Sequence, residues 1–326
     1  MMRPWWLLFL SGCSGSPPMM MLPPDMALPA DVCVSDQAPV KLGQHFGIRA
    51  TLNVNVKVPA ECTGDSCILD KDAQASLLML AEIAQSGSNA KIVVRPCHIQ
   101  IPPLALKGQP MATQLTAADA LVQTVKPVSA EATLAGTATC AAFSSTPIAI
   151  LIGTRLVSPV SDALPKFTKG ATPEVALCGS VASTSCDSAS DNGCVCDQEG
   201  DAKTGATLVA SGLPAFDDID RVYVAMRTAV TLDGVVFPEG ALSLHPGQRL
   251  RGTVQGLKME QSPVGCRRTP SGGASSDCDL TVVDAVAKLN PLVTQSVNKK
   301  STFVAMPVAD GATCDTLTAE ANTLFK

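Results

Sequence analysis

Strict alternation of apolar and polar residues over Phe46–Val58 is the feature that most constrains the fold of this chain. Every even-numbered side chain in this stretch is apolar, and every odd-numbered position is polar, charged or glycine. Successive side chains of a β-strand point to opposite faces of a sheet, so the stretch predicts a strand with one buried and one solvated face. At about 3.4 Å per residue the strand would extend for roughly 40 Å, which is long. A strand of this length should coil, which favours a barrel or a strongly twisted sandwich.

Further segments indicate an all-β, predominantly antiparallel fold that is barrel-like or a closed sandwich, with one or two short helices. Residues 75–85 and 91–101 flank Ser86-Gly87-Ser88-Asn89 and are expected to form a hairpin. A helix over residues 73–85 is the alternative, because Ala, Leu and Met are common there. We expect more strands in the segments 132–141, 148–157, 205–210, 221–232, 250–261 and 280–289.

Several local signals refine this outline. The continuous apolar run 148–152 predicts a strand buried on both faces. Asp233-Gly234 is expected to form a turn, and Gly252 and Gly256 mark places where a strand can bend or bulge. A short helix is expected after Thr116, which would act as its N-cap with Asp119 three residues later.

The cysteines indicate a disulfide framework. Thirteen are present, and the nearest separations suggest that Cys62 pairs with Cys67 and Cys266 with Cys278. The alternative is zinc binding by reduced cysteines in a cytosolic protein, which the absence of a CxxC pair makes less attractive. Apart from Cys13, the disulfide candidates are Cys33, Cys62, Cys67, Cys97, Cys140, Cys178, Cys186, Cys194, Cys196, Cys266, Cys278 and Cys314.

The first residues resemble the signal peptide and lipobox of bacterial lipoproteins. Arg3 precedes a short apolar run that ends in Leu10-Ser11-Gly12-Cys13, and in that family a peptidase cuts before the cysteine, which then carries lipid. The resemblance implies a signal peptide over residues 1–12, lipidation of Cys13 and a membrane partner bound through acyl chains. Ser14 follows Cys13, and in Gram-negative lipoproteins the absence of Asp there implies sorting to the outer membrane. The even remainder of twelve cysteines agrees with export.

The rest of the chain divides into a tether and one domain. Residues 13–40 contain Pro17-Pro18, Pro23-Pro24 and a run of three Met without periodicity, which is typical of a tether. Residues 41–326 are expected to form a single disulfide-rich β domain, with residues 178–205 as an acidic, cysteine-rich insertion. No later apolar run approaches the length of about 18 residues that spans a bilayer.

Composition excludes several classes of partner. Without residues 1–12 the chain has 23 basic and 29 acidic residues and no basic patch, so nucleic acid is not an expected partner. That part contains no Trp and a single Tyr, Tyr223, whereas sugar-binding modules and single-strand binders stack their ligands on aromatic rings.

Asp197-Gln198-Glu199-Gly200-Asp201 is the best candidate for a metal site. Oxygen ligands at alternate positions around a glycine resemble a degenerate calcium loop, with Asp197, Glu199 and Asp201 as ligands of a structural Ca²⁺. The match departs from an EF-hand, because Ala202 stands in place of its glycine and Leu208 in place of its bidentate glutamate. A solvated acidic loop held by disulfides is the simpler interpretation.

No catalytic residue can be assigned. GxSxG, HExxH and nucleotide-binding motifs are absent, and the three His residues, His45, His98 and His245, are far apart in the sequence. Whether the chain is an enzyme stays open, with a non-enzymatic role favoured. The expected role is a cell-envelope binding protein for an apolar ligand or lipid; the alternative is a structural or adhesion-type surface module without a small-molecule site.

Overall fold

Two long strands, β11 (Ile219–Phe237) and β12 (Arg249–Arg268), form the ladder on which the fold is assembled. The computed structural model describes residues 42–57, 71–103, 114–135, 141–211, 218–237 and 249–325, all within one compact unit, Val34–Lys326. The signal peptide, Cys13 and the tether therefore lie outside the described residues, as do Cys33, Cys62, Cys67, Cys140 and His245.

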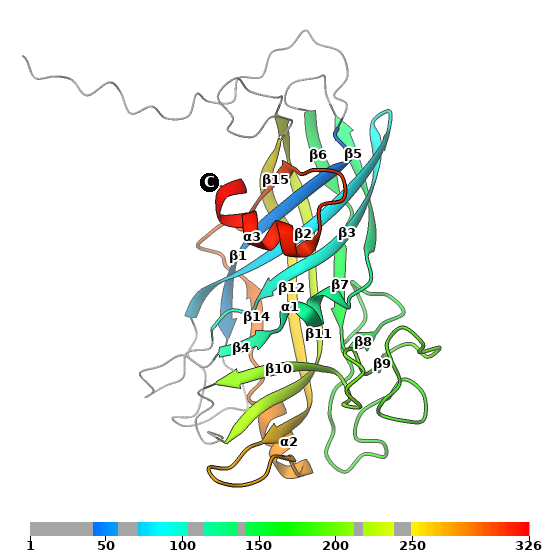
Figure 1. Cartoon of the computed structure of the whole chain (residues 1–326), viewed down its shortest axis with the longest axis vertical. Coiled ribbons are helices and arrows are strands. Elements are labelled where there is room, and N and C mark those ends of the chain that lie inside the picture. Colours follow the sequence, from blue (N-terminus) through cyan, green and yellow to red (C-terminus); the bar gives the residue numbers. More distant parts are fainter. Residues whose placement is uncertain are drawn as a thin grey trace, which may run out of the picture. The chain divides into compact units, whose positions relative to one another are not determined.

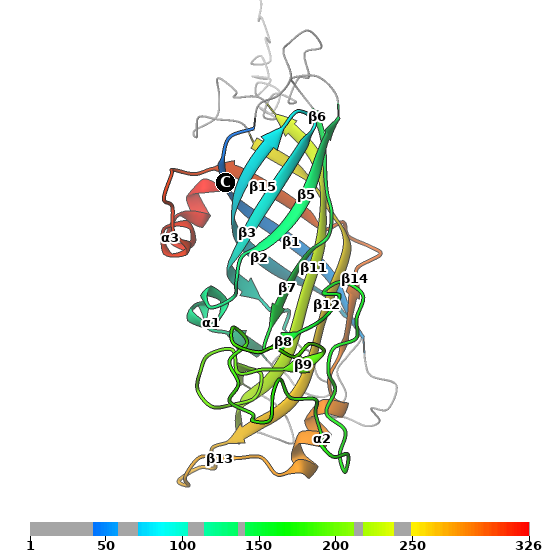
Figure 2. The same ribbon diagram turned by 90° about the vertical axis from the view of Figure 1, so that its right-hand side faces the viewer.

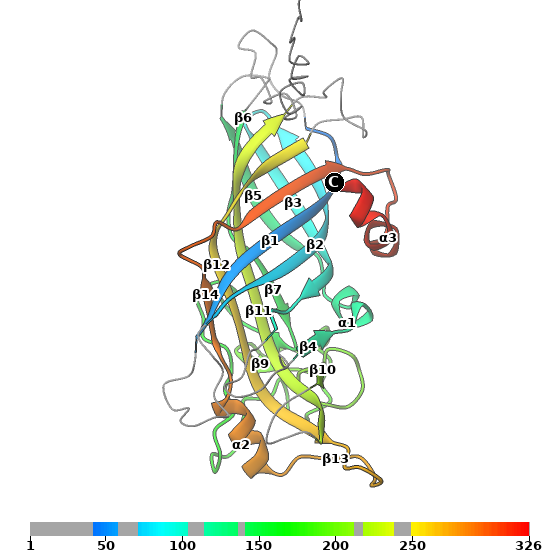
Figure 3. The ribbon, with the colours of Figure 1, turned by 90° about the vertical axis from the view of Figure 1, so that its left-hand side faces the viewer.

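The antiparallel ladders close into a ring. From β1 they run through β2, β3, β5, β6, β11, β12 and β15 and return to β1 (Figures 1 and 3). This confirms the expected all-β, predominantly antiparallel fold. The remaining ring strands are β1 (His45–Lys57), β2 (Lys71–Ser86), β3 (Asn89–Gln100), β5 (Val128–Ala135), β6 (Ala141–Ser145) and β15 (Thr302–Pro307).

Short strands share the outer edges of the long ladder. The free edge of β11 is taken in turn by β10 (Ala206–Ser211), β7 (Ile148–Ile152) and β6. The free edge of β12 is taken by β13 (Ser276–Asp277), β14 (Leu292–Gln295) and β15. β4 (Gln114–Ala117) pairs with β10, and β8 (Thr154–Arg155) pairs with β9 (Cys194–Val195) in a separate sheet.

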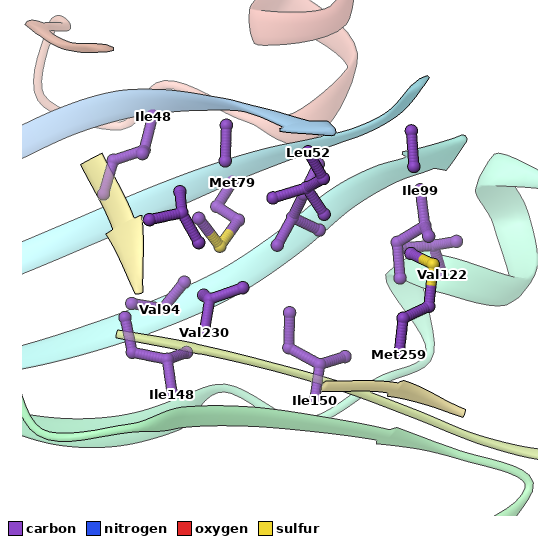
Figure 4. Close-up of a cluster of buried hydrophobic side chains, with 14 of the residues drawn as sticks. Ile48, Leu52, Met79, Val94, Ile99, Val122, Ile148, Ile150, Val230 and Met259 are labelled. Carbon is purple, nitrogen blue, oxygen red and sulfur yellow. The ribbon is translucent and has the colours of Figure 1, made fainter. Parts of the chain in front are cut away.

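Apolar side chains fill the inside of the ring. The even-numbered residues of β1 from Phe46 to Val56 are at most 3% exposed, as the alternation predicted. They meet apolar side chains from β2, β3, β7, β11 and β12 (Figure 4). The rings of Phe143 on β6 and Phe303 on β15, both buried, lie 6.5 Å apart between their centroids and so meet across the interior.

Helices lie outside the ring. α3 (Cys314–Leu324) rests on the outer face of β1–β3, and α1 (Asp119–Gln123) lies below it on the same side (Figure 2). Gly47 makes room for α3, because a Cβ there would come within 2.5 Å of the Leu317 side chain. The odd-numbered face of β1, expected to be solvated, is therefore covered at this end.

The hairpin prediction is confirmed, and its helical alternative is wrong. Residues 75–85 lie in β2, and Gly87 and Ser88 connect β2 to β3 with Ser86 opposite Asn89. Gly87 has a φ of 62°, which a turn residue without a Cβ adopts without strain. Gly256 likewise has a φ of 57° and lies in a β-bulge of β12, as expected from the sequence.

Other local predictions are wrong. Residues 280–289 form the helix α2 (Leu280–Lys288), because the Asp279 side chain accepts hydrogen bonds from two backbone N–H groups and Val283 and Val286 form its buried face. Asp233-Gly234 continues β11, since Gly234 faces Gly252 on β12 and a Cβ on either glycine would lie about 2 Å from the opposite backbone. Thr116 belongs to β4, and the N-cap of α1 is Ala118.

Candidate functional site

The acidic loop brings its three predicted ligands together. Carboxylate oxygens of Asp197, Glu199 and Asp201 lie within 4.8 Å of one another. Asp197 is only 1% exposed, and its carboxylate accepts hydrogen bonds from the backbone N–H groups of Gly200, Asp201 and Ala202. These contacts give Asp197 a role in holding the loop closed, and binding of Ca²⁺ here stays a prediction.

Glu199 is the member of this cluster with an altered titration. Burial raises its pKa, and the neighbouring Asp201 adds to the effect, although the Thr207 N–H donates to Glu199 Oε1 at 2.8 Å. The second oxygen, Oε2, is buried without a hydrogen-bond partner among the described residues. The loop therefore holds a carboxyl group with a raised pKa beside one that is tied to backbone amides.

Two disulfides fix the insertion around this loop. Cys178 pairs with Cys194 on β9, and Cys186 pairs with Cys196, which directly follows β9. The two nearby cysteines Cys194 and Cys196 therefore bond to different partners. The predicted Cys266–Cys278 bond is confirmed, and Cys97–Cys314 fastens α3 to β3. All eight cysteines of the described residues are paired in this way, which contradicts zinc binding by those cysteines.

The segment that precedes the insertion, residues 156–177, is bound to the long ladder by a buried cation. Arg227 on β11 is 1% exposed, and it donates to the backbone carbonyls of Pro159 and Asp162 and to the Glu260 carboxylate. Arg227 lies on the face of β11 that points away from the core, and residues 156–177 pass over that face and bury its guanidinium.

A second polar contact joins the insertion to β13. The Lys203 ammonium lies 2.7 Å from Asp277 Oδ2, and the Tyr223 hydroxyl donates to Asp277 Oδ1 at 3.3 Å. Burial raises the pKa of Tyr223 to about 12, and the Asp277 carboxylate acts in the same direction. Tyr223 is thus a neutral donor that holds two segments together.

The two described histidines contact different aspartates and do not belong to one site. His45 Nε2 lies 3.3 Å from Asp310 Oδ1, and His98 Nδ1 lies 2.6 Å from Asp119 Oδ1. Within the described ranges neither imidazole hydrogen-bonds a serine or cysteine side chain, so a nucleophile activated by histidine is not assembled there.

One hydroxyl in the ring interior has no hydrogen-bond partner among the described residues. Thr228 is 1% exposed and stands opposite Ile150 and Met259, whose side chains belong to the core. Its Oγ1 has no hydrogen-bond partner in the described part of the chain. Thr228 therefore places one unsatisfied polar group in an apolar part of the described interior.

A cleft of about 340 Å³ lies on the outside of the ring. Its floor is formed by β2 and β3, and its walls come from the end of α1, the connection after β15 and the start of α3. Four of its side chains carry or can carry charge: His45, Glu82, Arg95 and Asp315. Sequence patterning could not indicate this site, because its residues come from four distant segments.

No protein-family model, curated protein or solved structure matches this chain. Among the described residues, none of the helices combines the length and the apolar character needed to cross a membrane.

Proposed function

We propose that this chain is a non-enzymatic protein of the bacterial cell envelope, anchored by acyl chains on Cys13, whose folded part is a surface module that recognises its partner on its outer face. One observation carries this proposal. The inside of the ring is occupied by the protein's own apolar side chains, whereas the cleft over β2 and β3 lies outside. A filled interior leaves the outer surface as the place for recognition.

The pairing of the cysteines supports export. Disulfides persist in oxidising compartments, and all cysteines of the described residues form them. Together with Leu10-Ser11-Gly12-Cys13 this supports an envelope location, and Ser14 favours the outer membrane. More than one acyl chain would give stable attachment.

Binding of a lipid or another apolar ligand inside the ring is the second candidate. Closed β-barrels commonly hold one such molecule, and the unpartnered hydroxyl of Thr228 would suit the polar end of a mostly apolar ligand. The buried apolar side chains that occupy the core around Thr228 weigh against it.

Metabolic labelling with radioactive palmitate tests the anchor. Wild-type cells should label the protein, and Cys13→Ala should abolish labelling because the acceptor thiol is lost. Cys33→Ala is the matched control, since it also removes a cysteine from the predicted exported part. Equal labelling of the wild type and Cys13→Ala would refute the anchor.

Native mass spectrometry of residues 41–326, exported in the host behind a cleavable signal peptide without a lipobox in place of residues 1–40, separates the two candidates. The surface-module proposal expects the mass of the disulfide-bonded chain without retained lipid. A stoichiometric apolar adduct would instead establish the interior as a ligand site.

A further inference from the structure

The cleft over β2 and β3 has a floor on which charge and apolar surface alternate. Leu80 stands opposite Arg95, and Glu82 stands opposite Val93, in the β2–β3 ladder. Directly opposite residues share a face, and the buried neighbours Met79 and Val94 point inward, so these four side chains all face the cleft. The two charges therefore lie on one diagonal of the floor and the two apolar side chains on the other.

Both charges on this floor are unpaired within the part of the chain that the structure describes. Neither the Arg95 guanidinium nor the Glu82 carboxylate forms a side-chain hydrogen bond or an ion pair with another described residue. Diagonal neighbours in an antiparallel ladder are about 7–8 Å apart, which is too far for contact unless the side chains turn toward each other. The strands therefore hold the bases of these two side chains at this spacing, while their charged ends can turn toward a ligand.

The other polar groups of the cleft are already engaged. His45 contacts Asp310, and Asp315 Oδ1 accepts a hydrogen bond from Gln123 Nε2 at 3.1 Å. Thr313 closes the N-terminus of α3 with a capping box. The disulfide Cys97–Cys314 holds this wall against the floor. Among the described residues that line the cleft, the charged groups left free for recognition are therefore those of Arg95 and Glu82.

We propose that this cleft binds a short aliphatic peptide zwitterion, with its carboxylate on Arg95 and its ammonium group on Glu82. Arginine recognises carboxylates with two parallel hydrogen bonds. The apolar body would lie over Leu80 and Val93. A dipeptide extends for about 7 Å, which is close to the usual spacing of diagonal residues in an antiparallel ladder, so the two exposed side chains can reach its two ends. The volume of the cleft is within the usual range for small ligands, about 300–1,000 Å³.

Asp315 adds to the preference for a zwitterion over an anion. Its carboxylate lines the wall of the same cleft, so the site holds two acidic groups against one arginine. A simple carboxylic acid would meet Arg95 but leave Glu82 and Asp315 unopposed. An ammonium group on the ligand compensates them. This inference rests on the proposed function, because it names a ligand for the outer face.

Isothermal titration of the disulfide-intact domain with glycyl-leucine tests the proposal. The wild type should bind this dipeptide, whereas the N-acetylated and C-amidated forms should bind at least tenfold more weakly, since each loses one charge-assisted contact. Arg95→Gln should bind the free acid and the amide equally well. Glu82→Gln should likewise fail to distinguish the free amine from its acetylated form.

Lys91→Gln is the matched control, because Lys91 is exposed on β3 outside the cleft. It should bind glycyl-leucine as the wild type does. No binding at millimolar concentrations, or binding that is unchanged by Arg95→Gln and Glu82→Gln, would overturn the proposal. Such a result would not contradict the proposal that the folded part is a surface module. Lipid retained by the protein in native mass spectrometry would contradict the surface-module proposal, but it would not test binding of the dipeptide.

Discussion

The guanidinium group of Arg227 is buried, so its hydrogen bonds determine how much Arg227 contributes to the stability of the fold. It bridges two backbone carbonyls and the half-buried Glu260 carboxylate. Arg227→Met should lower the free energy of unfolding by about 3 kcal/mol, because two buried carbonyls lose a charged donor and the Glu260 carboxylate keeps only the Lys258 ammonium, 3.6 Å away. Urea denaturation measures the loss.

The same substitution at an exposed arginine provides the control. Arg95→Met, on the outer face of β3, should change the free energy of unfolding by less than about 0.5 kcal/mol. Equal losses for Arg227→Met and Arg95→Met would contradict the anchoring role of Arg227.

Two buried threonines differ in whether their hydroxyl group has a hydrogen-bond partner. Thr228 Oγ1 has no partner in the described residues, whereas Thr154 Oγ1 donates to the Cys194 carbonyl at 2.8 Å. Replacement by valine removes a hydroxyl with little change of shape. Thr228→Val should raise the free energy of unfolding by about 1 kcal/mol, and Thr154→Val should lower it by a similar amount.

Thermal and urea unfolding of both valine variants would test these signs. Stabilisation by Thr154→Val, or destabilisation by Thr228→Val, would show that the hydroxyl environments differ from those described. Destabilisation at Thr228 would also indicate that a water molecule or ligand satisfies its oxygen.

At the scale of elements, the loop around Glu199 and the start of β2 should respond to pH in opposite ways. Burial raises the pKa of Glu199, so its favourable contribution is present below its ordinary pKa of 4.5 and is lost as pH rises through the raised value. Hydrogen bonds, first that from Asn298, lower the pKa of Asp72. Its contribution is therefore present above 3.8 and is lost as pH falls through the lowered value.

Melting temperatures across pH 3–8 of Glu199→Gln and Asp72→Asn measure this contrast. Glu199→Gln should be more stable than the wild type at neutral pH and equal to it in acid. Asp72→Asn should be less stable at neutral pH and should converge with the wild type in acid. Parallel pH profiles for the two variants would contradict the assigned environments.

Elements with a local periodic signal were predictable, and those decided by contacts with distant segments were not. The alternation along β1 and the Gly87 turn each follow from neighbouring residues. In α2, valines typical of strands lie at helical spacing behind the Asp279 cap, so the cap and the buried face outweigh β propensity. Arg227 is buried by a segment more than sixty residues away, which no local pattern records.

The same contrast between local signals and distant contacts holds for the acidic loop and the cleft. Asp197, Glu199 and Asp201 are adjacent in sequence, and their proximity could be predicted. The cleft residues Glu82, Arg95 and Asp315 come together only through the ladder of β2 and β3 and the placement of α3. Closure of the ring was expected from the coiling of one long strand, but the order of its strands was not.

For the molecule as a whole, the disulfides should differ in their effect on stability according to the length of chain they enclose. Cys97–Cys314 spans 217 residues and Cys266–Cys278 spans 12. Closing a longer loop removes more entropy from the unfolded chain, so Cys97→Ala/Cys314→Ala should cost about 5 kcal/mol and Cys266→Ala/Cys278→Ala about 3 kcal/mol. Guanidinium denaturation of the two double variants gives the order, and the reverse order would contradict this account.

The pairing of β15 with both β1 and β12 also sets the order in which the chain can fold. Phe46 pairs with Pro307, so the ring closes between segments at opposite ends of the described chain. Until residues 302–307 have been synthesised, β1 and β12 each present an open edge to which other chains can add. Contacts so distant in sequence slow folding. We therefore expect a chain that ends before Thr302 to aggregate, however complete its remaining strands are.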